Sequence, residues 1–226
     1  MRKWGIVISI VYALIVLGLL TPGAILIVGG DVAKWGELAG NVWGVYSNWV
    51  YWLPAGAVLV GEAALLFLTV DTSRQRLKPR AHILVSGTVA AALTAILSAA
   101  AIWSIGFAVR GDDFWSSFWD NATYIALFMG GLWLLWGIFF YFYMRNSSAP
   151  VTRVISWLLR GSVLELLIAV PCHIIVRRRQ DCSAPAATSF GITAGIAIML
   201  LSFGPSVLLL YKKRLDEYAR RRPAVE

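Results

Sequence analysis

The residues that could do chemistry are concentrated in one apolar stretch of the chain, between positions 157 and 182. It contains a cation and an acid, Arg160 and Glu165, which are followed by Cys172 and His173. The stretch is apolar enough to cross a bilayer, where a charged side chain at the centre costs roughly 2.5–3.5 kcal/mol on insertion scales. Charges in such a place are usually paired or functional, so this stretch supplies the candidate site.

A second acid, Glu62, lies inside another apolar segment. If that segment descends through the bilayer while the 155–176 segment ascends, a rise of ~1.5 Å per residue places Glu62 and Glu165 at nearly the same depth. The long side chain of Arg160 could then pair with Glu62, and Glu165 would share this cation, be protonated or meet a ligand. These residues are therefore candidates for proton handling or ligand binding. The alternatives are a clamp that only joins helices, and an Arg160 side chain that extends toward the interface.

Glu165, Cys172 and His173 share one broad helical face, because the second and third follow the first after seven and eight residues. His173 is thus a further candidate for ligand binding or proton handling. Cys172 and Cys182 are predicted near an oxidising outer face, which favours a disulfide over a metal site, with two free buried thiols as the alternative. A metal site is disfavoured, because adjacent helical residues point about 100° apart and no CxxC or HxxxH pattern occurs. Pro171 is expected to open the helix locally.

The sequence does not identify a cofactor. Its histidines, His82 and His173, are expected near opposite membrane faces, so one chain cannot supply both axial ligands of a haem. A haem shared with another subunit stays open. The chain has no phosphate-binding glycine loop, nucleophile elbow or zinc-protease helix, and we therefore assign no catalytic residue.

Three consecutive arginines lie near the end of the apolar stretch that contains Arg160 and Glu165. Guanidinium groups bind anionic headgroups or phosphates through forked hydrogen bonds, so this run is a candidate anion-binding site. The alternative is pairing with a loop that is expected on the same side of the membrane. The arginines are Arg177, Arg178 and Arg179, and the acids of that loop are Asp112, Asp113 and Asp120.

The composition places the chain in a membrane. Of its 226 residues, 59% are hydrophobic and only 14% are charged, against roughly 25% charged residues in soluble domains. The formal net charge of +8 does not indicate nucleic-acid binding, because the basic residues lie at the ends of apolar segments, where they meet anionic headgroups. The expected partners are the lipid bilayer, including anionic lipids, and either protein partners or further copies of this chain.

Six apolar segments predict an all-α bundle, because a segment in lipid must satisfy its backbone hydrogen bonds internally. Each is long enough for the ~30 Å hydrocarbon core. Gly191 and Gly195, in GxxxG spacing, and a small-residue stripe in the third segment favour close helix packing. Apolar residues at near-helical spacing between 32 and 45 predict a short amphipathic helix at the interface. The single transmembrane domain covers 1–226, with spans at about 4–28, 50–70, 83–109, 124–143, 155–176 and 190–211.

The distribution of basic residues predicts the orientation. With both termini cytoplasmic, fourteen of the 20 Lys and Arg residues face inward and five outward, and three of those five are Arg177 to Arg179. Alternatively, the fifth segment is re-entrant around Pro171 and returns these arginines inward. That arrangement would expel the basic C-terminal tail, a larger violation of the charge rule. Six full spans in a bacterial inner membrane are therefore favoured.

These features predict a multi-pass membrane protein without a catalytic signature, acting as a subunit or binding module of a larger membrane assembly. One alternative is a small proton-linked transporter that uses Glu62, Arg160 and Glu165. A transporter requires a water-accessible path to such groups, whereas a scaffold requires a dry, packed centre. Another alternative is a membrane enzyme that acts on a lipid or quinone at the outer face, through Cys172, His173 and Arg177 to Arg179.

Overall fold

The computed structural model is helical almost throughout the residues it describes, namely 2–27, 35–71, 79–114, 122–145, 150–179 and 184–221, and these contain no strand. Some side chains within these ranges also lie outside the description, among them those of Glu62, His82 and every residue after 203. The elements in chain order are α1 (Arg2–Ile27), α2 (Trp35–Ser47), α3 (Trp49–Asp71), α4 (Pro79–Arg110), the 3-10 helix η1 (Gly111–Phe114), α5 (Ala122–Met144), α6 (Pro150–Arg179) and α7 (Ala184–Arg221).

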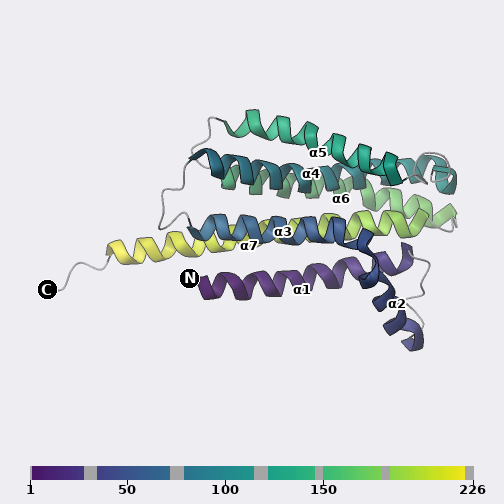
Figure 1. Cartoon of the computed structure of the whole chain (residues 1–226), viewed down its shortest axis with the longest axis horizontal. Helices are drawn as coiled ribbons and strands as arrows, with labels where there is room; N and C mark the ends of the chain where they lie inside the picture. Colours follow the sequence, from purple (N-terminus) through teal and green to yellow (C-terminus); the bar gives the residue numbers. More distant parts are fainter. Residues whose placement is uncertain are drawn as a thin grey trace.

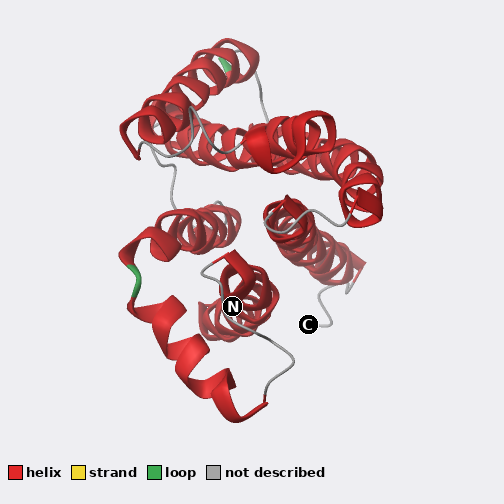
Figure 2. Ribbon diagram, turned by 90° about the vertical axis from the view of Figure 1, so that its right-hand side faces the viewer, coloured by secondary structure: helices red, strands yellow, loops and turns green. Residues whose placement is uncertain are grey.

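Six long helices lie side by side and alternate in direction along the chain, with the short α2 at a steep angle beside them (Figure 1). We call the end of the bundle where α1 begins and α7 ends the terminal end. The opposite end, where α2, η1 and the start of α7 lie, is the η1 end. The long helices form two layers, one of α4, α5 and α6 and the other of α1, α3 and α7 (Figure 2).

Among the residues that the structure describes, four helices are long and apolar enough to cross a membrane. They cover Leu84–Phe114, Thr123–Met144, Val151–Arg179 and Ala184–Phe203. Within the described residues, α1 and α3 contain the shorter apolar stretches Ser9–Pro22 and Ala55–Leu65. The all-helical class and the membrane character are thus confirmed, whereas the full set of six spans stays a prediction.

α6 runs without interruption through Pro171 over 30 residues, a length of about 45 Å. A re-entrant segment would have to reverse direction near this proline, so the structure contradicts that alternative. The expected opening at Pro171 is also absent, and α1 continues in the same way through Pro22. Membrane helices tolerate such prolines because neighbouring groups and small local adjustments satisfy the freed carbonyl.

The helices extend beyond the predicted spans because hydropathy marks the apolar part of a helix and not its ends. α4 and α6 begin at Pro79 and Pro150, and a proline fits the first helical turn because its missing N–H would have no partner there. The helix predicted between 32 and 45 is present as α2. Its Val45 is buried and its Trp43 is 75% exposed, which is the amphipathic arrangement that the spacing predicts.

The centre of the bundle is the region where α4, α6 and α7 pack on one another. The predicted small-residue stripe of α4 faces the neighbouring helices. Gly87 and Ala91 contact α5, and Trp136 Nε1 of α5 donates a hydrogen bond of 3.0 Å to Ser98 Oγ. α5 packs mainly on α4 and turns a broad apolar face outward.

Candidate functional site

Glu165 lies in the middle of α6 and is only 2% exposed. Its carboxyl group points at α7, where Oε2 occupies the space that a Cβ atom on Gly195 would need. Neither carboxyl oxygen has a hydrogen-bond partner among the residues that the structure describes. A buried polar group without a partner is uncommon and calls for a reason. Glu165 is therefore the centre of the candidate site.

The close approach of three helices at this point depends on the GxxxG pair of α7. Gly191 lies against α4, with Ser104 Oγ 3.2 Å from the position of a Cβ atom. Gly195, one turn further along, lies against α6 and admits the carboxyl group of Glu165. The predicted close packing at both glycines is confirmed, because their missing side chains let the neighbouring helices approach.

The two helices that face Glu165 bring no opposite charge. Residues 84–109 of α4 and residues 184–203 of α7 include no Asp, Glu, Lys, Arg or His. An ionised carboxylate in a dry interior costs several kcal/mol unless charges or hydrogen bonds compensate it. A protonated carboxyl group, in turn, has an O–H group that can donate. The carboxyl group of Glu165 can therefore still bind a proton, a cation or a ligand that forms hydrogen bonds.

Arg160 does not join this site, because its side chain is exposed on a different side of α6. The offset of five positions from Arg160 to Glu165 turns the helix by about 140° beyond one full rotation. An exposed guanidinium fits the interpretation in which Arg160 extends along the apolar surface toward the interface. A pair between Arg160 and Glu62 stays a prediction, because the Glu62 side chain lies outside the described residues.

The expectation that Glu62 and Glu165 lie at the same depth is wrong. Gly61, next to Glu62, lies at the level of Val89 and Leu93 of α4, whereas Gly161 of α6 lies 3.4 Å from Leu97. α4 and α6 run in the same direction (Figure 1), so Glu165 is level with residue 101 of α4. About ten residues of helix, or roughly 15 Å, therefore separate the two depths. Counting residues from predicted span ends misses this offset, because packing decides how far each helix is shifted along its neighbours.

His173 lies about two turns beyond Glu165 on α6, toward the η1 end. Its Nδ1 is 2.8 Å from Thr188 Oγ1 of α7, and Thr188 Oγ1 also donates a hydrogen bond of 3.0 Å to the carbonyl oxygen of Ala184. A hydroxyl group has one proton. Thr188 therefore accepts from an Nδ1–H of His173 when it donates to Ala184, and this bond joins α6 to α7.

Cys172 is partly buried and packs against the buried cluster around Phe107 and Val176. Cys182 lies outside the described residues, so the disulfide stays a prediction. The described residues contain no group of three or more His, Cys, Asp or Glu that could hold a metal ion. The backbone of His82 belongs to the first turn of α4, at the other end of the bundle from His173.

The three arginines form the exposed last turn of α6, at the η1 end. Asp112 of η1 accepts a hydrogen bond of 2.9 Å from the backbone N–H of Ala184 and so caps the start of α7. The chain enters η1 through Gly111, whose φ of 62° belongs to the left-handed region that favours glycine. From the sequence, Asp112 is a candidate for charge pairing with these arginines, and the cap is not predicted. Headgroup binding by Arg177 to Arg179 stays a proposal, and Asp120 lies outside the described residues.

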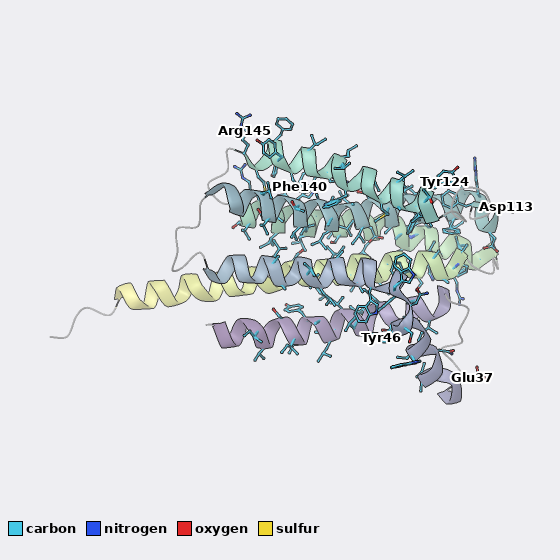
Figure 3. The ribbon with its side chains drawn as sticks, in the orientation of Figure 1. Glu37, Tyr46, Asp113, Tyr124, Phe140 and Arg145 are labelled. Carbon is cyan, nitrogen blue, oxygen red and sulfur yellow. The ribbon has the colours of Figure 1, made fainter. Side chains whose placement is uncertain are left out.

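The ends of the bundle differ in their charged residues. Arg145 lies at the terminal end and Asp113 at the η1 end (Figure 3). α6 ends where α7 begins, so Arg177 to Arg179 and the basic last part of α7 are at opposite ends. A six-span arrangement requires this separation.

Sequence analysis did not predict a role for Ser104 or Thr188. The available signal is the spacing of residues 188, 191 and 195, at i, i+3 and i+7, which places all three on one face of α7. Its meaning becomes visible only with the partners that α4 and α6 place against that face.

No family model, no curated protein and no solved structure matches the chain. We therefore infer its function from the geometry of the described residues.

Proposed function

We propose that this protein is a proton-handling integral membrane protein in which Glu165 takes up and releases the proton. One observation carries the proposal. Both oxygens of Glu165 are buried without a partner among the described residues, at the contact between two helices that are long and apolar enough to cross a membrane. A residue that served only as an interhelical clamp would make a bond across this contact, and Glu165 makes none within the described structure.

The two protonation states of Glu165 place different demands on the packing of α6 against α7. The neutral carboxyl group is compatible with an apolar seam. The ionised group requires water, a cation or hydrogen-bond donors to enter, because its desolvation otherwise costs several kcal/mol. Loss of the proton is thus coupled to what the seam contains, which is the property that a proton-linked transporter needs. Because Arg160 faces outward, this transporter proposal is centred on Glu165.

A membrane-permeant carbodiimide tests the proposal, because such reagents modify protonated carboxyl groups. With the full chain in lipid nanodiscs, we expect modification of Glu165 that falls as the pH rises and disappears in Glu165→Gln. Glu37→Gln, which changes an exposed acid of α2, is the matched control and should leave the modification unchanged. Peptide mass spectrometry locates the product. Failure of Glu165 to react at any pH, or a reaction independent of pH, contradicts the proposal.

A flux measurement extends this test to transport. In proteoliposomes with a trapped pH-sensitive dye, the wild-type chain should dissipate an imposed pH difference faster than Glu165→Gln. If the proton moves alone, this difference should appear without any added solute. If the proton moves with another substance, the difference should appear when that substance is present. Equal rates for the two proteins across a panel of inorganic ions would favour a proton-linked subunit over a transporter.

The role of a subunit in a larger membrane assembly is a compatible proposal. Extraction in a mild detergent followed by native mass spectrometry tests it, since a subunit should be isolated with a partner in a fixed ratio. The enzyme alternative has less support, because His173 is hydrogen-bonded to Thr188. We also propose that the terminal end faces the cytoplasm of a bacterial cell, on the basis of the excess of basic residues in the segments predicted at that end. Reporter fusions after residue 226 test this orientation.

A further inference from the structure

Three successive turns on one face of α7 each meet a polar group from a neighbouring helix. Nearest the η1 end, Thr188 bonds to His173 of α6. One turn further, Gly191 lies against Ser104 of α4, and at the next turn Gly195 lies against Glu165. The polar groups thus follow one another from the η1 end to the centre of the bundle.

We propose that protons reach Glu165 from the η1 end along this face of α7, through Ser104 and the His173–Thr188 pair. The inference rests on the proposed function and adds the direction of access. It assigns Ser104 and Thr188 as positioning residues of a proton path whose inner end is Glu165.

The chemistry of each group suits this role. Ser104 Oγ is buried and has no hydrogen-bond partner in the described part of the chain, so this hydroxyl can both donate and accept. The Cβ positions of Gly191 and Gly195, where Ser104 and Glu165 contact α7, are about 5–6 Å apart. That separation suits one bridging water, which needs two to four polar partners. His173 is the ionisable group that follows toward the η1 end.

The other direction from Glu165 is lined mainly by apolar side chains. Toward the terminal end, the same three helices are filled by members of the large buried cluster. Two buried hydroxyl groups there donate to carbonyl oxygens of their own helices, Ser162 to Leu158 and Ser202 to Ile198, each at 2.9 Å. Thr94 Oγ1 of α4 is buried without a partner among the described residues, but it lies about seven residues of helix, or roughly 10 Å, from the level of Glu165. The cluster members that form this apolar part are Leu97, Leu158, Ala197, Ile198 and Leu201.

At the η1 end, a second and much smaller buried cluster surrounds the start of the path. It consists of Phe107, Ala108, Val176 and Ala184. Along α4, Ser104 and the level of Glu165 near residue 101 lie between Leu97 of the large cluster and Phe107 of the small one.

The charged and titratable groups beside the path are few. α6 contributes Cys172, His173 and Arg177, and η1 contributes Asp112. α4 and α7 contribute none over residues 84–109 and 184–203, as stated above. The side chain of Glu62 on α3 lies outside the described residues, and its neighbour Gly61 contacts α4 about 15 Å nearer the terminal end.

Hydrogen–deuterium exchange of the Glu165 carboxyl group tests this direction. Infrared difference spectroscopy of the full chain in nanodiscs follows the carboxyl band, and its absence in Glu165→Gln assigns it. We expect Ser104→Ala and the near-isosteric Thr188→Val to slow exchange at least about tenfold, since positioned proton transfer contributes roughly 10²–10⁴-fold. Ser162→Ala, which removes a buried hydroxyl one turn to the other side of Glu165, should leave the rate within about twofold.

One further variant keeps the test decisive. Thr188→Ser retains the hydroxyl group and should restore exchange that Thr188→Val slows, which separates proton transfer from packing. If Ser162→Ala slows exchange as much as Ser104→Ala does, or if Ser104→Ala and Thr188→Val exchange like the wild type, the proposed direction is wrong. A wild-type carboxyl group that neither exchanges nor reacts with carbodiimide would instead refute the proposed function itself.

Discussion

The two sides of α6 place ionisable residues in opposite environments. On the exposed side, Arg160 and Arg178 are eighteen residues apart, which is about 27 Å along the helix. This distance is close to the ~30 Å of a hydrocarbon core, so the two arginines bound an apolar band that suits contact with lipid. On the buried side, Glu165 faces α7 and has no partner in the described residues. The exposed apolar residues of the band include Val163, Leu164, Leu167, Ile174 and Ile175.

Arg160 and Glu165 show that an ionisable residue inside an apolar segment can have two different explanations. Arg160 has a long stem that carries its charge toward the interface, and its cost is therefore reduced without a protein partner. Glu165 is shorter and lies against a glycine, so its group stays at the depth of its backbone. Burial of Glu165 without a partner costs free energy, and ionisable residues kept at such a cost are usually functional.

Reversal of the buried charge should have the largest effect. Glu165→Lys introduces a longer, unpaired cation at the α6–α7 contact, and we expect a loss of roughly 2.5–3.5 kcal/mol in the free energy of unfolding. Equilibrium unfolding in mixed detergent–lipid micelles measures it. Glu165→Gln, which keeps the shape of the side chain, should remain close to the wild type. A lysine variant as stable as the glutamine variant would show that this position is wet.

A side chain at Gly195 should have the next largest effect. Gly195→Ala places a Cβ atom where Glu165 Oε2 lies, and overpacking of this kind costs about 1–3 kcal/mol. In a Glu165→Ala background the clash is absent, so the same substitution should cost much less; the double-mutant cycle measures the coupling. Gly130→Ala in α5, where nothing lies within 4 Å of the added atom, is the control. Additive free energies in the cycle would contradict the contact.

Loss of the cap on α7 should have a moderate effect. Asp112→Ala removes the acceptor for the backbone N–H of Ala184, and a lost cap costs typically about 1 kcal/mol. Asp112→Asn keeps a side-chain oxygen and should retain most of the stability. Amide hydrogen exchange over the first turn of α7 provides a local measurement. Equal exchange in all three proteins would mean that this cap does not hold the helix start.

The smallest effect is expected for Arg160→Gln on the exposed side of α6. Substitutions outside packed features change the free energy of unfolding by no more than about 0.5 kcal/mol, and the same unfolding assay applies. Glu165→Lys in the same experiment gives the contrast between the two sides. A loss of several kcal/mol in Arg160→Gln would indicate a buried ion pair, with Glu62 as its first candidate partner.

The sequence by itself determined the features that depend on one segment at a time. Apolar length and low charge predicted the helical membrane class, near-helical spacing predicted α2, and the pair Gly191 and Gly195 predicted close packing. Each follows from local rules, because backbone hydrogen bonds in lipid must close within a helix and a missing side chain always allows closer approach.

Only the tertiary structure decided which of these features meet. The sequence singled out Glu165 and Gly195 separately, but their contact requires a particular rotation and offset of α6 against α7. The same offsets put Glu62 and Glu165 at different depths and turned Arg160 outward. These rotations and offsets are set by many weak packing contacts spread over several helices. They therefore cannot be read from the sequence of any single segment.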